Sequence, residues 1–198
     1  MNKASHVILG NFLCERLKYE YGIHLNKENF LLGNILPDIS AKFLIKPHIL
    51  KNYHMQIKRL IQNMLDEEQT SVFSGKRFSR NLGIICHYYA DFFCYPHNSK
   101  YTGDIASHFK YERDLFLFLA GGFLKNDEAS DVHYPTQEAT AEIIFERFKS
   151  LHDTYIENMP SFYNDISYSL TACTEALILI ISTALIEQMN EYQLCYPA

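Results

Sequence analysis

Residues that interrupt helices are widely spaced along this chain. Only 8 glycines and 6 prolines occur in 198 residues, which disfavours a turn-rich all-β fold and favours long, rarely interrupted elements. Because 47% of the residues are hydrophobic, a chain of this length can fill a sizeable core without additional cross-links. The expected fold class is therefore all-α.

Apolar residues that recur at helical spacing predict about seven helices. The first begins near Ser5, with Ser5 or an adjacent residue as the expected N-cap, and ends at Gly22. A short apolar segment, Asn29 to Leu36, is closed by Pro37, so Asp38 is expected at the start of the following connection. The other predicted helices cover about residues 47–68, 76–95, 104–119 and 135–158 and the stretch after Pro160.

The domain organisation expected from this pattern is simple. No internal repeat, low-complexity run or linker separates the predicted helices, so residues 1–198 are expected to form a single all-α domain. No C-terminal lipid-binding domain is expected after the last helix.

Charge and cysteine usage narrow the function classes. With 18 basic and 23 acidic residues, the formal net charge of −5 gives no broad positive field, and long nucleic acid is not an expected partner. The five cysteines (Cys14, Cys86, Cys94, Cys173 and Cys195) are odd in number and form no CxxC pair. We therefore expect buried free thiols in a reducing compartment.

Neither a signal peptide nor a transmembrane segment is predicted. Glu15 and Arg16 interrupt the apolar N-terminal stretch too early for a secretion signal. The longest apolar stretch, from Leu170 to Ile186, contains Glu175 and falls short of the ~20 residues that cross a bilayer. A buried C-terminal helix and a cytoplasmic protein are expected, with peripheral membrane contact left open.

Two histidine–carboxylate pairs are candidate metal ligands. His87 and Asp91 stand four residues apart within one predicted helix, and His108 and Glu112 do so in the next, so each pair projects from one helix face. A single pair of this kind is typical of a surface ion pair. Here His97 lies between the two pairs in the pattern H-x3-D-x5-H-x10-H-x3-E. The preceding proline ends the helix and allows the imidazole to turn toward the second pair, which favours a metal site.

This pattern resembles the zinc-dependent phospholipases C and the related single-strand-specific zinc nucleases, all-helical enzymes that hold three zinc ions. The resemblance extends upstream to His6 in Ala-Ser-His-Val-Ile, Asp38 in Leu-Pro-Asp-Ile and His54 in Asn-Tyr-His-Met, so it covers about residues 5–112. Five imidazoles and three carboxylates make a donor set that suits zinc and is poor for calcium or magnesium.

The resemblance implies a ligand set for each ion. Asp38, His54, His87 and Asp91 would hold one zinc, and His97, His108 and Glu112 a second, while Asp91 bridges to a third zinc held by His6. Three protein ligands leave the second zinc one open position for water or substrate. The implied reaction is phosphodiester hydrolysis by metal-activated water, with Asp38 orienting or deprotonating that water.

Departures from the family pattern concern the third ion. Secreted members use the amine and carbonyl of an N-terminal tryptophan, whereas this chain has no tryptophan and begins with Met1. Either the Met1 amine or a processed neighbour substitutes, or His6 and Asp91 hold an ion completed by water, or two zinc ions suffice. Ala90 replaces the usual glycine before Asp91, and Pro96 directly precedes His97.

The sequence therefore predicts a zinc-dependent phosphodiesterase that cleaves a phospholipid or a small phosphodiester. A nuclease or nucleotidase of the same fold, and a metal-binding helical protein without turnover, are the alternatives. The remaining histidines (His24, His48, His133 and His152) are interpreted as ordinary surface or helix-end residues, and the aromatic residues around Tyr88 and Phe92 as core.

Overall fold

The computed structural model describes residues 1–41, 46–66, 75–126 and 138–195. This part of the chain contains seven α-helices, two 3-10 helices and no strand, which confirms the predicted all-α fold. The elements are α1 (Lys3–Tyr21), α2 (Lys27–Ile39), α3 (Leu50–Asp66), α4 (Lys76–Phe92), η1 (Tyr95–His97), α5 (Ile105–Ala120), η2 (Phe123–Asn126), α6 (Ala141–Glu157) and α7 (Phe162–Cys195).

Two of the predicted helix boundaries near the N-terminus are corrected. The N-cap of α1 is Asn2, whose side-chain oxygen accepts a hydrogen bond from the Ser5 backbone N–H at 2.9 Å. Helix α2 continues through Pro37, because the Ser40 N–H still bonds to the Leu36 carbonyl at 3.0 Å. Asp38 therefore lies in the last turn of α2 and not in the connection after it.

Later boundaries differ less from expectation. Helix α3 begins at Leu50, three residues after the predicted start at Pro47, and α6 begins after the N-cap Thr140. The predicted opening of that helix at Pro135 lies outside the described residues. Helix α4 ends at Phe92, and Pro96 lies within the short 3-10 helix η1 that follows.

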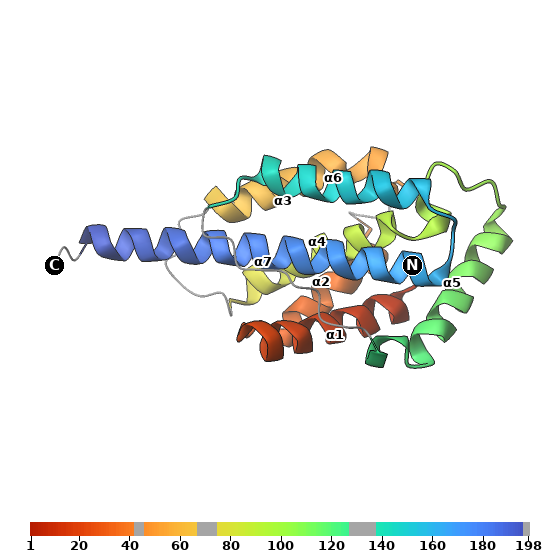
Figure 1. The fold of residues 1–198 in the computed structure, drawn as a ribbon, viewed down its shortest axis with the longest axis horizontal. Helices are drawn as coiled ribbons and strands as arrows, with labels where there is room; N and C mark the ends of the chain where they lie inside the picture. Colours follow the sequence, from red (N-terminus) through yellow and green to blue (C-terminus); the bar gives the residue numbers. More distant parts are fainter. Residues whose placement is uncertain (42–45, 67–74, 127–137, 196–198) are drawn as a thin grey trace.

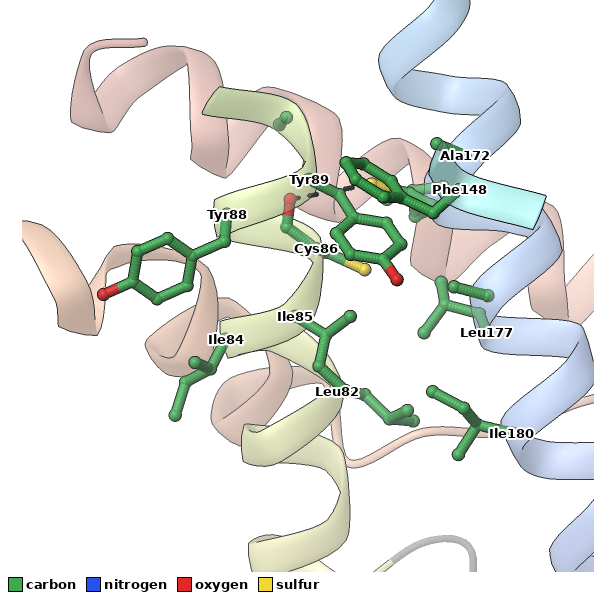
Figure 2. Packing of buried hydrophobic residues seen from close by; sticks show 14 of the residues in the cluster. Leu82, Ile84, Ile85, Cys86, Tyr88, Tyr89, Phe148, Ala172, Leu177 and Ile180 are labelled. Carbon is green, nitrogen blue, oxygen red and sulfur yellow. Dashed lines mark hydrogen bonds between the residues drawn. The ribbon is translucent and has the colours of Figure 1, made fainter. Parts of the chain in front are cut away.

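Helix α4 forms the centre of the bundle. It is apolar on most of its faces, as expected for a helix that is surrounded by others. Leu82, Ile85 and Tyr89 point toward α6 and α7, while Tyr88 points to the other side of α4 (Figure 2). Helix α7 runs the length of the molecule, with α3 and α6 on one side, α1 and α2 on the other, and α5 at one end (Figure 1). His87 and Asp91 thus belong to the most enclosed helix.

Glycines allow α2 and α4 to cross in close contact. A Cβ atom on Gly33 would lie 2.1 Å from the Arg80 carbonyl oxygen, and one on Gly83 would lie 2.1 Å from the Phe30 carbonyl oxygen. Only glycine permits this approach of two backbones. The crossing brings the Asn34 carbonyl oxygen within 2.8 Å of His87 Nδ1, so it also places a functional side chain.

The predicted buried C-terminal helix is observed as part of α7. Its segment Phe162–Ile186 is the one candidate in the described residues that is long and apolar enough to cross a membrane. Because 72% of the tested window is buried inside the bundle, a core helix accounts for it, and the evidence for a membrane span is weak. The four cysteines whose side chains are described, Cys14, Cys86, Cys94 and Cys173, are buried free thiols.

Candidate metal centre

Four side chains from three parts of the chain form what we call the first group: Asp38 on α2, His48 before α3, and His87 and Asp91 on α4. One ligand atom from each lies within 4.8 Å of the others. His48 Nδ1 is 3.0 Å from Asp91 Oδ2 and 3.1 Å from His87 Nε2. Both nitrogens are 3.7 Å from Asp38 Oδ1. Ligands at 2.0–2.1 Å from a tetrahedral zinc ion are about 3.4 Å apart, so these spacings fit one ion.

Backbone carbonyls orient the imidazoles. His87 Nδ1 donates to the Asn34 carbonyl at 2.8 Å, which directs Nε2 into the first group. His97 Nδ1 donates in the same way to the His48 carbonyl at 3.0 Å. A hydrogen bond from the distal ring nitrogen of this kind is usual for histidine metal ligands, because it fixes the tautomer and the ring orientation.

The structure does not bring His54 to the first group. Its Nδ1 lies 3.2 Å from the Leu50 carbonyl oxygen within α3, and its ring packs 6.3 Å from that of Phe145. His48, interpreted from sequence as an ordinary surface histidine, is 9% exposed and takes the expected place of His54. A sequence signal was available, because Pro47-His48 repeats the Pro-His pair of Pro96-His97.

The second group consists of Cys94, His97 and Glu112, whose ligand atoms also lie within 4.8 Å of one another. His97 Nε2 is 2.9 Å from Glu112 Oε1, and His108 Nε2 approaches the same oxygen at 3.1 Å. His108 is therefore brought to the centre as predicted, but at its rim, with a side chain that is 30% exposed. Cys94 was expected only as a buried thiol, and sequence reasoning gave it no place in the site.

Asp91 lies between the two groups. Its Oδ2 faces His48 and His87, while its Oδ1 contacts the Met1 amino nitrogen and lies 3.2 Å from His6 Nε2. The ring of His6 is also stacked on that of His87 at 4.0 Å. The two carboxylate oxygens thus face different partners, as the predicted bridging role requires.

A cation already lies among these carboxylates. The Met1 amino nitrogen is 3.2 Å from both Glu112 Oε1 and His97 Nε2 and forms an ion pair with Asp91. Burial works against the charge on this amine, but Asp91 and Glu112 raise its pKa well above the ordinary value. The centre is therefore a place where positive charge is favoured.

The buried acids and His6 have the protonation states that a metal site needs. Burial raises the pKa of Asp91 and of Glu112, yet the nearby Met1 amine and histidines hold both pKa values well below the usual range. Burial lowers the pKa of His6 to about 3, so its imidazole is neutral at pH 7. Charged carboxylates and neutral imidazoles are the forms that bind divalent ions. Burial also raises the pKa of Asp38.

A buried carboxylate on α7 supports the second group from behind. Asp165 Oδ2 accepts hydrogen bonds from the Tyr95 backbone N–H and the Tyr111 hydroxyl, both at 3.0 Å. Its Oδ1 accepts from the Tyr155 hydroxyl at 2.9 Å. Because Tyr95 begins η1 and Tyr111 precedes Glu112, Asp165 ties together the two segments that carry this group. Burial raises the pKa of Asp165 to about 6.

A helical bundle with imidazoles and carboxylates converging at its centre defines a metal-binding protein of the all-α class. The sequence model of the family described as zinc dependent phospholipase C matches residues 5–162, and the chain belongs to that family. No curated protein and no solved structure gives a significant match. At the level of the family, membership and donor set support a metal-dependent hydrolase with zinc as its metal.

Proposed function

We propose that this chain is a phosphodiesterase that hydrolyses the phosphodiester of a phospholipid. The observation that supports the proposal is the proximity of two donor groups, because the Met1 amine contacts both Asp91 of the first group and Glu112 of the second. The first group offers four protein donors, enough to surround a tetrahedral ion. The second group offers three, and His108 beside it is 30% exposed, so we assign substrate access to its side of the centre.

Zinc fits the nitrogen, oxygen and sulfur donors of the two groups. When bound, zinc supplies Lewis acidity, which lowers the pKa of water from 15.7 to roughly 7 and stabilises charge on phosphoryl oxygens. The protein must supply a group that orients the attacking water and accepts its proton. Asp38 suits this task because its side chain is 18% exposed, whereas those of His87 and Asp91 are fully buried. Its Oδ1 also faces the first group.

The role of Asp38 can be tested by Asp38→Asn, which keeps the shape and removes the basic oxygen. We expect turnover to be abolished while much of the metal remains bound, measured by elemental analysis and a phosphodiester assay on one preparation. Undiminished activity would remove Asp38 from the mechanism.

An apolar rim favours a lipid over a soluble substrate. Ile105 and Phe109 lie one turn apart on α5 and are 75% and 65% exposed. The ring of Phe109 is 5.9 Å from that of His108, which contacts Glu112 of the second group. Exposed apolar side chains beside a site commonly mark an interaction surface, and here they would enter the membrane interface. The cytoplasmic location expected from sequence stays a prediction. A cytoplasmic enzyme would meet its lipid substrate in the inner leaflet of the membrane.

The experiment uses zinc-loaded protein and phosphatidylcholine vesicles, with release of phosphocholine as the readout. Activity that disappears with chelator and returns with zinc supports the proposal. A chromogenic soluble phosphodiester and single-stranded DNA are assayed in parallel. Cleavage of DNA alone would favour the nuclease alternative, and zinc-loaded protein that is inert toward all three substrates would contradict a hydrolase.

The apolar rim has its own matched pair of variants. Phe109→Ser should lower the rate on vesicles while leaving the rate on the soluble diester unchanged, because only the interfacial step uses that side chain. Leu117→Ser changes a residue on the same helix that is 58% exposed and further from His108, so it serves as the control. Equal losses on both substrates would contradict the lipid-docking role.

A further inference from the structure

Backbone hydrogen bonds connect Cys94 to two residues of the metal centre, Asp91 and His97. The Cys94 N–H bonds to the Asp91 carbonyl at 2.9 Å, and the His97 N–H bonds to the Cys94 carbonyl at 2.8 Å. Cys94 is the N-cap of η1 and has extended backbone, so it joins the end of α4 to the start of η1. These two turns place Cys94 in the short connection between Asp91 and His97.

The thiol of Cys94 is enclosed and directed toward other donors. The residue has no exposed surface, and its Sγ lies within 4.8 Å of ligand atoms of His97 and Glu112. Cys173 differs, because its Sγ donates a hydrogen bond to the Cys86 carbonyl oxygen at 3.6 Å, as structural thiols often do. Within the described residues, the Cys94 thiol makes no hydrogen bond. Its surroundings offer metal ligands in place of a carbonyl acceptor.

We infer that Cys94 is a sulfur ligand of the metal ion held by His97 and Glu112. The inference rests on the proposed metal-dependent hydrolase and specifies one of its sites. One thiolate, one imidazole and one carboxylate give three protein ligands, which leave a tetrahedral ion one open position. His108 then acts from the rim by its hydrogen bond to Glu112. As the sulfur–metal bond forms, the S–H bond breaks and its proton passes to water.

A sulfur ligand also determines which metals the site accepts. Thiolate is a soft donor that favours zinc, cobalt or cadmium over magnesium and calcium. The second group would therefore prefer thiophilic metals more strongly than the first group, whose donors are nitrogen and oxygen only.

Cobalt provides a readout that does not depend on activity. Metal-free protein is titrated with Co²⁺, and the near-ultraviolet sulfur-to-cobalt charge-transfer band is recorded together with the visible cobalt bands. We expect the charge-transfer band in the wild type and in the control Cys173→Ser. In Cys94→Ser this band should be lost, while visible bands from nitrogen- and oxygen-bound cobalt persist. A band that survives in Cys94→Ser would overturn the inference.

A second measurement needs no variant. X-ray absorption of the zinc-loaded wild type should show a sulfur scatterer at about 2.3 Å in addition to nitrogen and oxygen at 2.0–2.1 Å. A metal-loaded, active protein without sulfur scattering would overturn the role of Cys94 and leave the proposed function intact. A protein that binds neither cobalt nor zinc would overturn both.

Discussion

The two donor groups differ in how they are built and in what lies beside them. The first takes two residues from the central helix α4, and His87 and Asp91 have no exposed surface. The second takes its residues from a 3-10 turn and from α5 at the end of the bundle, with His108 30% exposed beside it. The exposed His108 supports the proposed substrate access on the side of the second group.

Different supports hold the two groups in place. The first depends on the close crossing of α2 and α4, which aligns the Asn34 carbonyl with His87. The second depends on the Asp165 carboxylate, which holds η1 and α5 against α7. Damage to one support should therefore affect one group more than the other, and variants can separate them.

The largest effect is expected for His87→Ala. The change removes a ligand of the first group, leaves a cavity in the core and deprives the buried Asn34 carbonyl of its donor. We expect loss of one metal equivalent, loss of turnover, and a fall of roughly 3 kcal/mol in the free energy of unfolding. Elemental analysis and urea denaturation measure these effects. A variant that retains its full metal content would show that the first group is not a metal site.

The next test compares His48→Ala with His54→Ala. The first change removes a donor from the first group and should release its metal. The second removes a side chain whose hydrogen bond goes to Leu50 and whose ring lies beside Phe145, outside both donor groups. Metal content and activity close to wild type are expected for His54→Ala. The reverse result would restore the ligand set that the resemblance implied.

Gly33→Ala should damage the first group indirectly. An added methyl group meets the Arg80 backbone and must push α2 away from α4, at a cost of about 1–3 kcal/mol for such overpacking. Metal affinity should fall in the first group before the second, as seen in a two-step cobalt titration. Gly121→Ala is the control, because its nearest contact would be 3.3 Å. Equal weakening of both sites would contradict separate supports.

Asp165→Asn should damage the second group more gently. The amide cannot accept all the hydrogen bonds that the carboxylate accepts from Tyr95, Tyr111 and Tyr155. Loss of such an outer partner typically lowers metal affinity 10–100-fold, and we expect this at the second site only. Tyr155→Phe removes one of the three hydrogen bonds and should have a smaller effect. Unchanged affinity at the second site in Asp165→Asn would exclude the positioning role.

The raised pKa of Asp165 predicts that the free energy of unfolding depends on pH, and Asp165→Asn tests this. The folded-state pKa of Asp165, about 6, is above the ordinary carboxyl value of 3.8, so between pH 4 and 6 the folded state binds the extra proton. The carboxyl group therefore favours folding at low pH, and this contribution of about 3 kcal/mol disappears as the pH rises through 6. Urea denaturation of metal-free wild type and Asp165→Asn from pH 4 to 7 should show the difference. Parallel curves would contradict it.

Sequence reasoning predicted the helices and most of the centre because both depend on local spacing. The pairs four residues apart identify His87, Asp91 and Glu112 on their helices, and the proline before His97 indicates the turn. His48 was missed because the predicted helix began too early and included it. Cys94 was missed because a lone cysteine resembles a core residue, and the turns that place it between Asp91 and His97 are seen only in the structure. The Asp165 carboxylate accepts a hydrogen bond from Tyr95, which lies 70 residues earlier in the sequence, and no local pattern reveals such a contact.

The family match ends at residue 162, where α7 begins, yet the Asp165 carboxylate lies just beyond it. A fragment cut to the matched range would retain every side chain of both donor groups and lose the anchor beneath one of them. The same cut would remove the buried core residues that α7 packs against α4 and α6, so the fragment should lose the bundle as well as the anchor. Metal analysis of this protein therefore requires a chain that keeps α7, because trimming to the family boundary would report too low a metal content.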